Sequence, residues 1–229
     1  MIKFYPDGYP FILVSFFLTV ISLISLTWYI NKGEYSFIPF LILLCVTCLF
    51  YVLTLFMAFF FRDPERKIPE GEDIFVSPAD GKVILIKDVY EEKYLKSDAK
   101  EISIFMSPLN VHVNRVPCDG VVSMVKYSPG KFIAAYRDDA SMKNENIVIV
   151  LERNEKKVLV RQVAGFIARR AVCKVKVGDI LRRGERFGMI KFGSRLDVYL
   201  PKDTSIKVKL DENVKAGETI IGETERGRA

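Results

Sequence analysis

Two long apolar segments without charged residues open this chain, and they constrain its fold more than any other feature. The segments cover residues 11–30 and 37–61. At a helical rise of ~1.5 Å per residue, each is long enough to cross a hydrocarbon layer of ~30 Å. The connection between them, residues 31–36, leaves room only for an antiparallel hairpin. Residues 1–61 are therefore predicted to form a membrane anchor of two helices.

The basic residues around these segments predict the orientation of the anchor. Arg62, Arg66 and Lys67 follow the second segment, whereas the connection carries Lys32 alone. Because Lys and Arg favour the cytoplasmic side, we expect both termini and the rest of the chain on the cytoplasmic face of the cell membrane. A cleaved signal peptide is disfavoured, since no small-residue cleavage site follows the first segment and a second apolar segment does. A helical hairpin buried in a soluble protein is the other alternative.

The rest of the chain, residues 62–229, has the composition of a water-soluble and mildly basic domain. The four charged side chains of residues 1–61 cancel, so the whole formal net charge of +6 belongs to this domain. The excess is modest and no basic stripe with interleaved aromatic residues is present, which disfavours nucleic acid as a partner. The composition also excludes a disordered chain and a disulfide scaffold.

Short runs rich in β-branched residues, separated by Gly, Pro and Asp, predict that this domain is mainly β (α+β). The expected strands are Lys82–Val89, Glu101–Met106, Val121–Tyr127, Ile147–Leu151 and Val158–Val163. Further short strands joined by Gly-Asp and Gly-Glu turns over residues 177–222 indicate a compact antiparallel β-sandwich or barrel. Residues 91–100 and 132–143 are the expected short helices or lids.

Most common catalytic motifs are absent from the sequence. His112 is the only histidine, so no histidine pair is available for zinc, and H-E-x-x-H, G-x-S-x-G, P-loop and G-x-G-x-x-G patterns are missing. Cys45 and Cys48 form a C-x-x-C pair, but it lies in an apolar segment with no second pair. We therefore expect no metal site.

Three polar residues at predicted turns and strand ends remain as candidates: Asp80, His112 and Ser194. Each has a purely structural interpretation. Asp80 lies in the turn Pro-Ala-Asp-Gly, which has a near copy around Asp119, so it can be a turn residue. A lone histidine is often structural, and the pair Gly193-Ser194 is also typical of a tight turn.

Together with their neighbours, these residues give the chain a resemblance to the phosphatidylserine decarboxylase family, specifically to its short members. The resemblance covers about residues 60–205 in family order. The strings that carry it are Phe61–Arg66, Ser77–Gly81, Ser107–Arg115, Gly165–Arg170 and Lys191–Arg195.

The resemblance implies a self-processed enzyme with a covalent pyruvoyl group, and neither pyridoxal phosphate nor a metal. In the family, the serine of a Gly-Ser pair attacks the preceding carbonyl, the resulting ester is eliminated, and the serine becomes an N-terminal pyruvoyl group. Cleavage here would fall between Gly193 and Ser194 and give an α/β heterodimer of a β chain, 1–193, and an α chain, 194–229. A higher oligomer remains open.

The residue types suit this chemistry. Gly193 has no Cβ and can adopt the strained backbone that exposes its carbonyl. Ser194 needs a base to become a good nucleophile, and His112 has the only side chain that ordinarily titrates near neutrality. Asp80 would orient and stabilise the imidazole as in a serine-protease-like triad. The catalytic set implied by the resemblance is therefore Ser194, His112 and Asp80.

The substrate implied is a serine phospholipid in an anionic membrane surface, either phosphatidylserine, giving phosphatidylethanolamine, or its archaeal-lipid equivalent. Arg115, Arg169 and Arg170 are weak candidates for headgroup contacts. The chain departs from the long members of the family in two places. Their Leu-Gly-Ser-Thr cleavage motif is Phe-Gly-Ser-Arg here, and their second histidine, three positions after the first, is Arg115. The second change leaves His112 or a water as the proton donor.

Two other functions fit parts of the sequence. The turns of residues 177–222 are similar to those of biotinyl- and lipoyl-type carrier domains, which would make the chain a membrane-tethered carrier or binding module. No Met-Lys-Met or Asp-Lys-Ala site for the carried group appears there. A membrane-anchored zinc endopeptidase needs several histidines. The decarboxylase interpretation gives Asp80, His112 and Ser194 a joint purpose.

Overall fold

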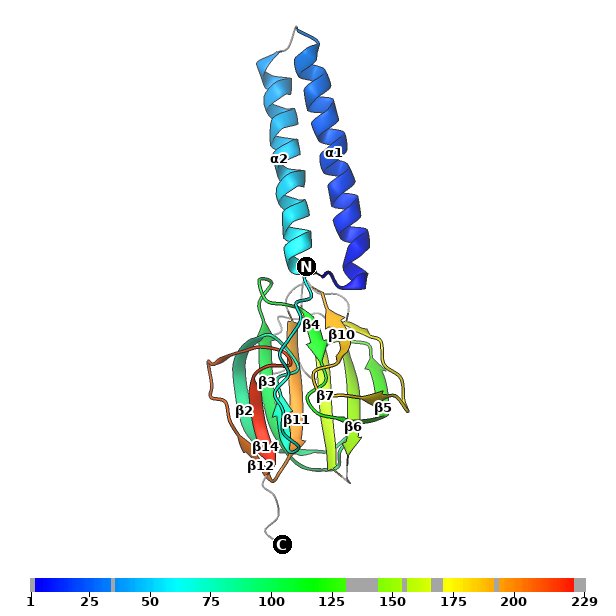
Figure 1. Ribbon diagram of the computed structural model, residues 1–229, viewed down its shortest axis with the longest axis vertical. Helices are drawn as coiled ribbons and strands as arrows, with labels where there is room; N and C mark the ends of the chain where they lie inside the picture. The colour runs from blue at the N-terminus through cyan, green and yellow to red at the C-terminus, as the bar shows by residue number, and fades with distance from the viewer. Residues whose placement is uncertain are drawn as a thin grey trace. The chain divides into compact units, whose positions relative to one another are not determined.

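The computed structural model describes residues 3–33, 36–130, 144–153, 156–165, 171–191 and 194–224. The chain divides into two compact units, residues 1–64 and 65–229. The first unit is a pair of antiparallel helices, and the second is built from β-strands (Figure 1).

The helical unit confirms the predicted hairpin. A short 3-10 helix η1 (Pro6–Gly8) leads into α1 (Tyr9–Asn31), and α2 (Phe37–Phe60) returns beside it (Figure 1). Proline occurs only in the first turn of each helix, where it is tolerated because that N–H has no intrahelical acceptor. Both helices are long and apolar enough to cross a membrane.

Small polar side chains lie where the two helices pack together. The hydroxyls of Thr19 on α1 and Thr54 on α2 are 3.0 Å apart. Ser15, Ser22 and Thr47 are also buried, and their hydroxyls donate to carbonyls of their own helices. Small residues of this kind let helix backbones approach closely within a membrane. Most of the large apolar side chains of the two helices are exposed, and a surface so apolar is typical of a segment that faces lipid.

The second unit consists of strands joined by turns, and the part of it that the structure describes contains no helix. In chain order the strands are β1 (Ile74–Val76), β2 (Gly81–Glu91), β3 (Ser97–Met106), β4 (Val113–Arg115), β5 (Gly120–Ser128), β6 (Asn146–Arg153), β7 (Lys156–Ala164), β8 (Ala171–Cys173), β9 (Ile180–Leu181), β10 (Arg186–Ile190), β11 (Ser194–Pro201), β12 (Thr204–Ile206), β13 (Asn213–Val214) and β14 (Ile220–Thr224). Each of the five strands predicted from β-branched runs is confirmed, and each is one to four residues longer at an end than predicted.

The strands form one large sheet and two small ones, all antiparallel. The large sheet has the order β13-β2-β3-β11-β7-β6-β5-β9 and curls like half a barrel (Figure 1). The small sheets have the orders β1-β14-β12 and β4-β10-β8. This architecture confirms the predicted mainly-β fold with a barrel-like body.

The two faces of the large sheet carry separate clusters of buried residues. Ile104, Val160 and Leu196 belong to the main core, on what we call the inner face. Leu159 and Tyr199 belong to a smaller cluster on the outer face. Because successive side chains of a strand point to opposite faces, even-numbered residues of β7 and β11 lie on the inner face and odd-numbered ones on the outer face.

The two Asp-Gly turns noticed in the sequence are structural equivalents. Oδ1 of Asp80 accepts a hydrogen bond of 2.8 Å from the Ala216 N–H, and Oδ1 of Asp119 accepts one of 2.7 Å from the Arg183 N–H. The glycine after each aspartate begins a long strand, β2 or β5. A Cβ on Gly81 would lie 2.2 Å from the Phe105 carbonyl oxygen, so the close strand contact requires glycine there.

The predicted short helix over residues 91–100 is wrong, whereas the alternative of a lid stays a prediction. Residues 92–96 form the tight turn between β2, which ends at Glu91, and β3, which begins at Ser97. The carboxylate of Glu91 accepts hydrogen bonds of 2.7 Å from the N–H groups of Tyr94 and Leu95, which stabilises the turn without a helix. The other predicted lid, residues 132–143, lies outside the described residues.

Candidate active site

Ser194 is the first residue of β11, in the middle of the large sheet. It pairs with Met106 on β3 and with Ala164 on β7. Its side chain is fully buried and lies on the inner face by strand alternation. The hydroxyl donates to the Met106 sulfur at 3.3 Å. A thioether sulfur is a weak acceptor, so this contact holds the hydroxyl proton only weakly.

His112 lies between β3 and β4 and is fully buried. Its carbonyl accepts a hydrogen bond from the N–H of Ile190, the last residue of β10, and thereby lies beside the segment that leads to Ser194. Nδ1 of the imidazole is 3.0 Å from the Asn110 carbonyl oxygen. Because a carbonyl can only accept, Nδ1 carries the proton of the neutral ring and Nε2 carries its lone pair.

The Asp80 carboxylate is held by a partner that the sequence did not predict. The Arg66 guanidinium donates to both of its oxygens, at 3.0 and 2.8 Å, and also lies 3.4 Å from the Glu218 carboxylate. The side chain of Arg66 is only 8% exposed. Arg66 is therefore part of a buried ion pair within the β unit, although its position after the apolar segment indicated a membrane-proximal cation. The role of Asp80 towards His112 stays a prediction.

The candidate headgroup residues are placed only in part. Arg115 is 4% exposed and donates to the Gly184 carbonyl at 2.9 Å, so its guanidinium lies inside the β unit instead of on its surface. Arg169, Arg170 and the predicted cleavage residue Gly193 lie outside the described residues. Headgroup recognition by these arginines stays a prediction.

Sequence reasoning missed a pair of buried amides beside Ser194. The Gln162 amide nitrogen donates to Oδ1 of Asn114 at 2.8 Å, and Nδ2 of Asn114 is 3.7 Å from the Met106 sulfur. Asn114 lies on β4 and Gln162 on β7, and both are fully buried. The only signal in the sequence was the presence of Asn114 in the string Ser107–Arg115.

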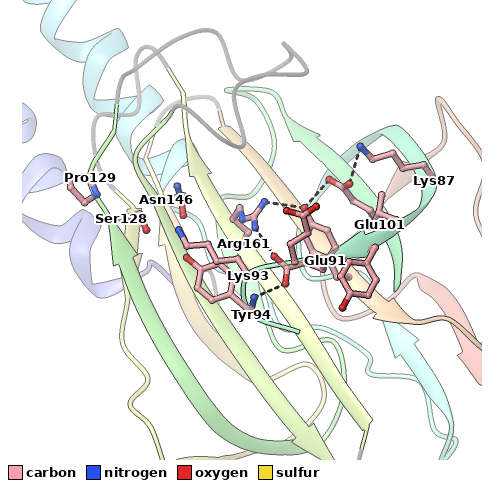
Figure 2. Close-up of a pocket in the computed structure, with 13 residues that line it drawn as sticks. Lys87, Glu91, Lys93, Tyr94, Glu101, Ser128, Pro129, Asn146 and Arg161 are labelled. Atoms are coloured by element: carbon pink, nitrogen blue, oxygen red, sulfur yellow. Dashed lines mark hydrogen bonds and ion pairs between the residues drawn. The ribbon is translucent and has the colours of Figure 1, made fainter. Parts of the chain in front are cut away.

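A polar cavity of about 740 Å³ opens on the outer face of the large sheet, on the other side from Ser194 (Figure 2). The Arg161 guanidinium donates to the Tyr199 hydroxyl at 3.0 Å, and that hydroxyl donates to Glu101 at 3.0 Å. The ammonium of Lys87 is 3.2 Å from the other Glu101 oxygen. Burial, and next the negative charge of Asp197, raise the pKa of Tyr199 far above its ordinary value, so the phenol stays protonated.

The outer-face network continues into the sheet through Arg195. Its Nε donates to Asp197 at 2.6 Å, and a terminal nitrogen donates to the Ser103 hydroxyl at 2.7 Å. The side chains of Arg195 and Asp197 are 2% and 0% exposed. This network links residues 194–201 to β3 through side chains, in addition to the backbone ladder.

The cysteines of the β unit are not placed for metal binding or nucleophilic chemistry. Burial, the largest cause, and the nearby Asp119 charge raise the pKa of Cys118 to about 12, so this thiol is protonated at neutral pH. Burial also raises the pKa of Cys173. Within the described ranges, no three His, Cys, Asp or Glu side chains are close enough to hold a metal ion.

Comparisons with known proteins agree on one family. The family whose model matches residues 53–222 of this chain is described as phosphatidylserine decarboxylase. The phosphatidylserine decarboxylase proenzyme of Syntrophus aciditrophicus (strain SB) is 46% identical over 217 residues, which cover 94% of this chain and 95% of the relative. The proenzyme of Geotalea uraniireducens (strain Rf4) is 46% identical and covers 94% of each chain. That of Chlorobium chlorochromatii (strain CaD3) is 51% identical over 81% of this chain and 87% of its own.

Proposed function

The chain belongs to the phosphatidylserine decarboxylase family, and from this membership we propose that it decarboxylates a serine phospholipid with a pyruvoyl group made from its own Ser194. The observation that carries the proposal is the position of Ser194. It begins a central strand, is fully buried, and comes four positions after Ile190, whose N–H donates to the His112 carbonyl. The acceptor that its hydroxyl meets among the described residues is a weak one, the Met106 sulfur, which gives little structural reason for a polar side chain here.

The proposed maturation begins when Oγ of Ser194 attacks the carbonyl carbon of Gly193. Oγ loses its proton, the C–O bond forms, the C–N bond breaks, and the Ser194 nitrogen takes up a proton, which leaves an ester. Loss of the Ser194 Cα proton then breaks the bond between Cβ and the ester oxygen and frees the Gly193 carboxylate. Water then replaces the nitrogen of residue 194, which leaves as ammonia. A ketone is left at the start of the α chain, 194–229.

In this proposal His112 is the base that takes the hydroxyl proton. The Asn110 carbonyl supports the role, because it keeps the proton of the neutral ring on Nδ1 and so places the lone pair on Nε2. Asp80 stabilises the positive charge that the ring acquires, as in a serine-protease-like set. Arg66 and the Ala216 N–H hold the Asp80 carboxylate in a fixed position.

The surroundings of Ser194 fit a pyruvoyl group. The residue is excluded from water, and the pairing of β11 with β3 and β7 would hold the new N-terminus of the α chain in place after cleavage. When formed, the ketone supplies the electron sink that a carboxylate alpha to an amine needs in order to leave as CO₂. In this proposal His112 also carries the proton that replaces the lost carboxylate.

The helical hairpin suits a substrate that stays in the bilayer. Each buried CH₂ holds a phospholipid in the membrane by ~0.8 kcal/mol, so the enzyme must work at the membrane surface. We propose that α1 and α2 anchor the chain in the cell membrane with the β unit on its cytoplasmic face. Arg115, Arg169 and Arg170 are retained as weak candidates for headgroup contacts, with Arg115 the least favoured because it is buried.

A direct assay tests this proposal. The full chain is purified in detergent and mixed with phosphatidylserine, and phosphatidylethanolamine and CO₂ are measured. We expect equal amounts of both products from the wild type and none from Ser194→Ala. Ser123→Ala is the matched control, because that hydroxyl lies on β5, a strand that does not pair with β11, and donates to the Val150 carbonyl, so the variant should retain activity. Equal activity of wild type and Ser194→Ala would reject the proposal.

A further inference from the structure

One backbone carbonyl determines the orientation of the two buried amides beside Ser194. The Val172 oxygen can only accept, so the Gln162 amide atom 3.3 Å from it is nitrogen. The same nitrogen is 2.8 Å from the Asn114 amide, so the Asn114 atom that faces it is oxygen. Flipping both amides would place two acceptors against each other at Val172. The donor Nδ2 of Asn114 is therefore turned towards Met106.

The backbone leaves the space that this arrangement needs. Gly188 on β10 lies opposite Asn114 on β4 and opposite Cys173 on β8. A Cβ at this position would lie 2.9 Å from the Gln162 amide nitrogen and 2.2 Å from the Val172 oxygen. The absence of a side chain at Gly188 thus allows the amide to reach both of its acceptors.

This orientation of the Asn114 and Gln162 amides leaves one buried polar atom without a hydrogen-bond partner in the part of the chain that the structure describes. Oε1 of Gln162 is buried and has no hydrogen-bond partner among the described residues. A buried acceptor without a partner lowers stability, and such losses are expected mainly where function requires the arrangement. The amide pair is therefore a candidate for a functional role and not only for packing.

The Asn114 donor and the Ser194 hydroxyl meet at one atom. The Met106 sulfur is 3.3 Å from Oγ of Ser194 and 3.7 Å from Nδ2 of Asn114. Sulfur is a weak acceptor, so it satisfies neither donor fully. A strong donor is thus held beside the reacting hydroxyl, in a place closed to water, and among the described residues its acceptor is the weak Met106 sulfur.

We propose that Nδ2 of Asn114 donates to the oxygen that becomes negative during chain cleavage, and that Gln162 positions it. The inference rests on the self-cleavage proposed above. When Oγ of Ser194 bonds to the preceding carbonyl carbon, the C=O π electrons move to the carbonyl oxygen, and the Oγ proton passes to His112. A preorganised donor stabilises that oxygen, and loss of one such donor slows a reaction about 10²–10³-fold.

Asn114→Asp tests the donor, since it keeps the shape of the side chain and an acceptor for Gln162 but replaces Nδ2 by oxygen. The full chain is made by cell-free synthesis with lipid nanodiscs, samples are quenched at intervals, and the fragment 194–229 is quantified by mass. At pH 7.5 we expect cleavage to be about 10²–10³-fold slower than in the wild type. Asn146→Asp, the same substitution on the outer face, is the matched control and should cleave at the wild-type rate.

The pH profile separates a donor from a merely structural residue. Wild-type cleavage should slow as the pH is lowered, because a protonated imidazole at His112 cannot act as the base. The ratio of variant to wild-type rate should rise over the same range, because the carboxyl at position 114 regains a donor when it is protonated. Among the described residues, the side chains of Met106 and Gln162 hydrogen-bond to Asn114. Neither of these two side chains titrates.

The outcomes distinguish this inference from the proposed function. If the wild type is cleaved and Asn114→Asp is cleaved equally fast at every pH, the inference is wrong and the proposed function stands. If the wild type is not cleaved, both fail. If Asn114→Asp does not fold, Gln162→Leu replaces it, since that variant keeps Asn114 but removes what orients it. Slower cleavage of folded Gln162→Leu supports the inference, and an unchanged rate overturns it.

Discussion

Replacing His112 by asparagine is expected to slow chain cleavage about 10²–10⁴-fold, the usual contribution of a general base. The amide of asparagine can still donate to the Asn110 carbonyl as Nδ1 does, but it offers no basic nitrogen in place of Nε2. The fragment 194–229 is measured against time after synthesis. Because a base must be neutral to accept a proton, the wild-type rate should also fall as the pH is lowered.

Folding is the control for this experiment. The melting temperature of His112→Asn should stay close to that of the wild type, because the substituted side chain keeps the hydrogen bond to Asn110. A folded variant that is cleaved at the wild-type rate would remove His112 from the mechanism. The base would then have to be sought among other residues near Ser194.

Asp197→Ala is expected to lower the free energy of unfolding by about 3–5 kcal/mol, because it leaves the buried Arg195 charge without its closest partner. In a domain of this size, each kcal/mol shifts the melting temperature by about 2–4 °C. The melting temperature of the full chain in detergent is the measurement.

The matched control is another aspartate of the same segment. Asp203 pairs with Lys156 at the surface, where both side chains are about half exposed, and such pairs contribute about 0–1 kcal/mol. Asp203→Ala should therefore melt close to the wild type. Equal melting temperatures for Asp197→Ala and Asp203→Ala would show that the buried network contributes little to stability.

The network also bears on the proposed cleavage. Arg195, Asp197 and Tyr199 lie in the segment that would become the α chain, whereas Ser103, Glu101 and Arg161 lie in the β chain. Together with the ladders of β11 to β3 and β7, these contacts would keep the two chains associated after the peptide bond breaks.

Local patterns in the sequence were enough to predict the elements of the fold. Uncharged apolar runs predicted α1 and α2, and β-branched runs predicted β2, β3, β5, β6 and β7, because both signals depend on neighbouring residues only. The turn at residues 91–100 was mistaken for a helix, since its Glu, Lys and Tyr residues are compatible with either. The hydrogen bonds that the Glu91 carboxylate accepts from the N–H groups of Tyr94 and Leu95 decide the conformation.

The contacts within the site depend on long-range register, which a single sequence does not reveal. Arg66 reaches Asp80 and Glu218, and Gln162 reaches Asn114 from a different sheet. The sequence contains no pattern that joins such distant positions. The resemblance to a known family predicted a shared site for His112 and Ser194, but it did not indicate the amides between β4 and β7.

The intact mass of the purified full chain, measured beside Ser194→Ala, tests the central claim most directly. The account predicts that the wild type separates into fragments 1–193 and 194–229, with a ketone in place of the amino group on the second. Ser194→Ala should remain a single chain of 26.2 kDa. A wild-type chain that stays uncut at 26.2 kDa after incubation at neutral pH would contradict it.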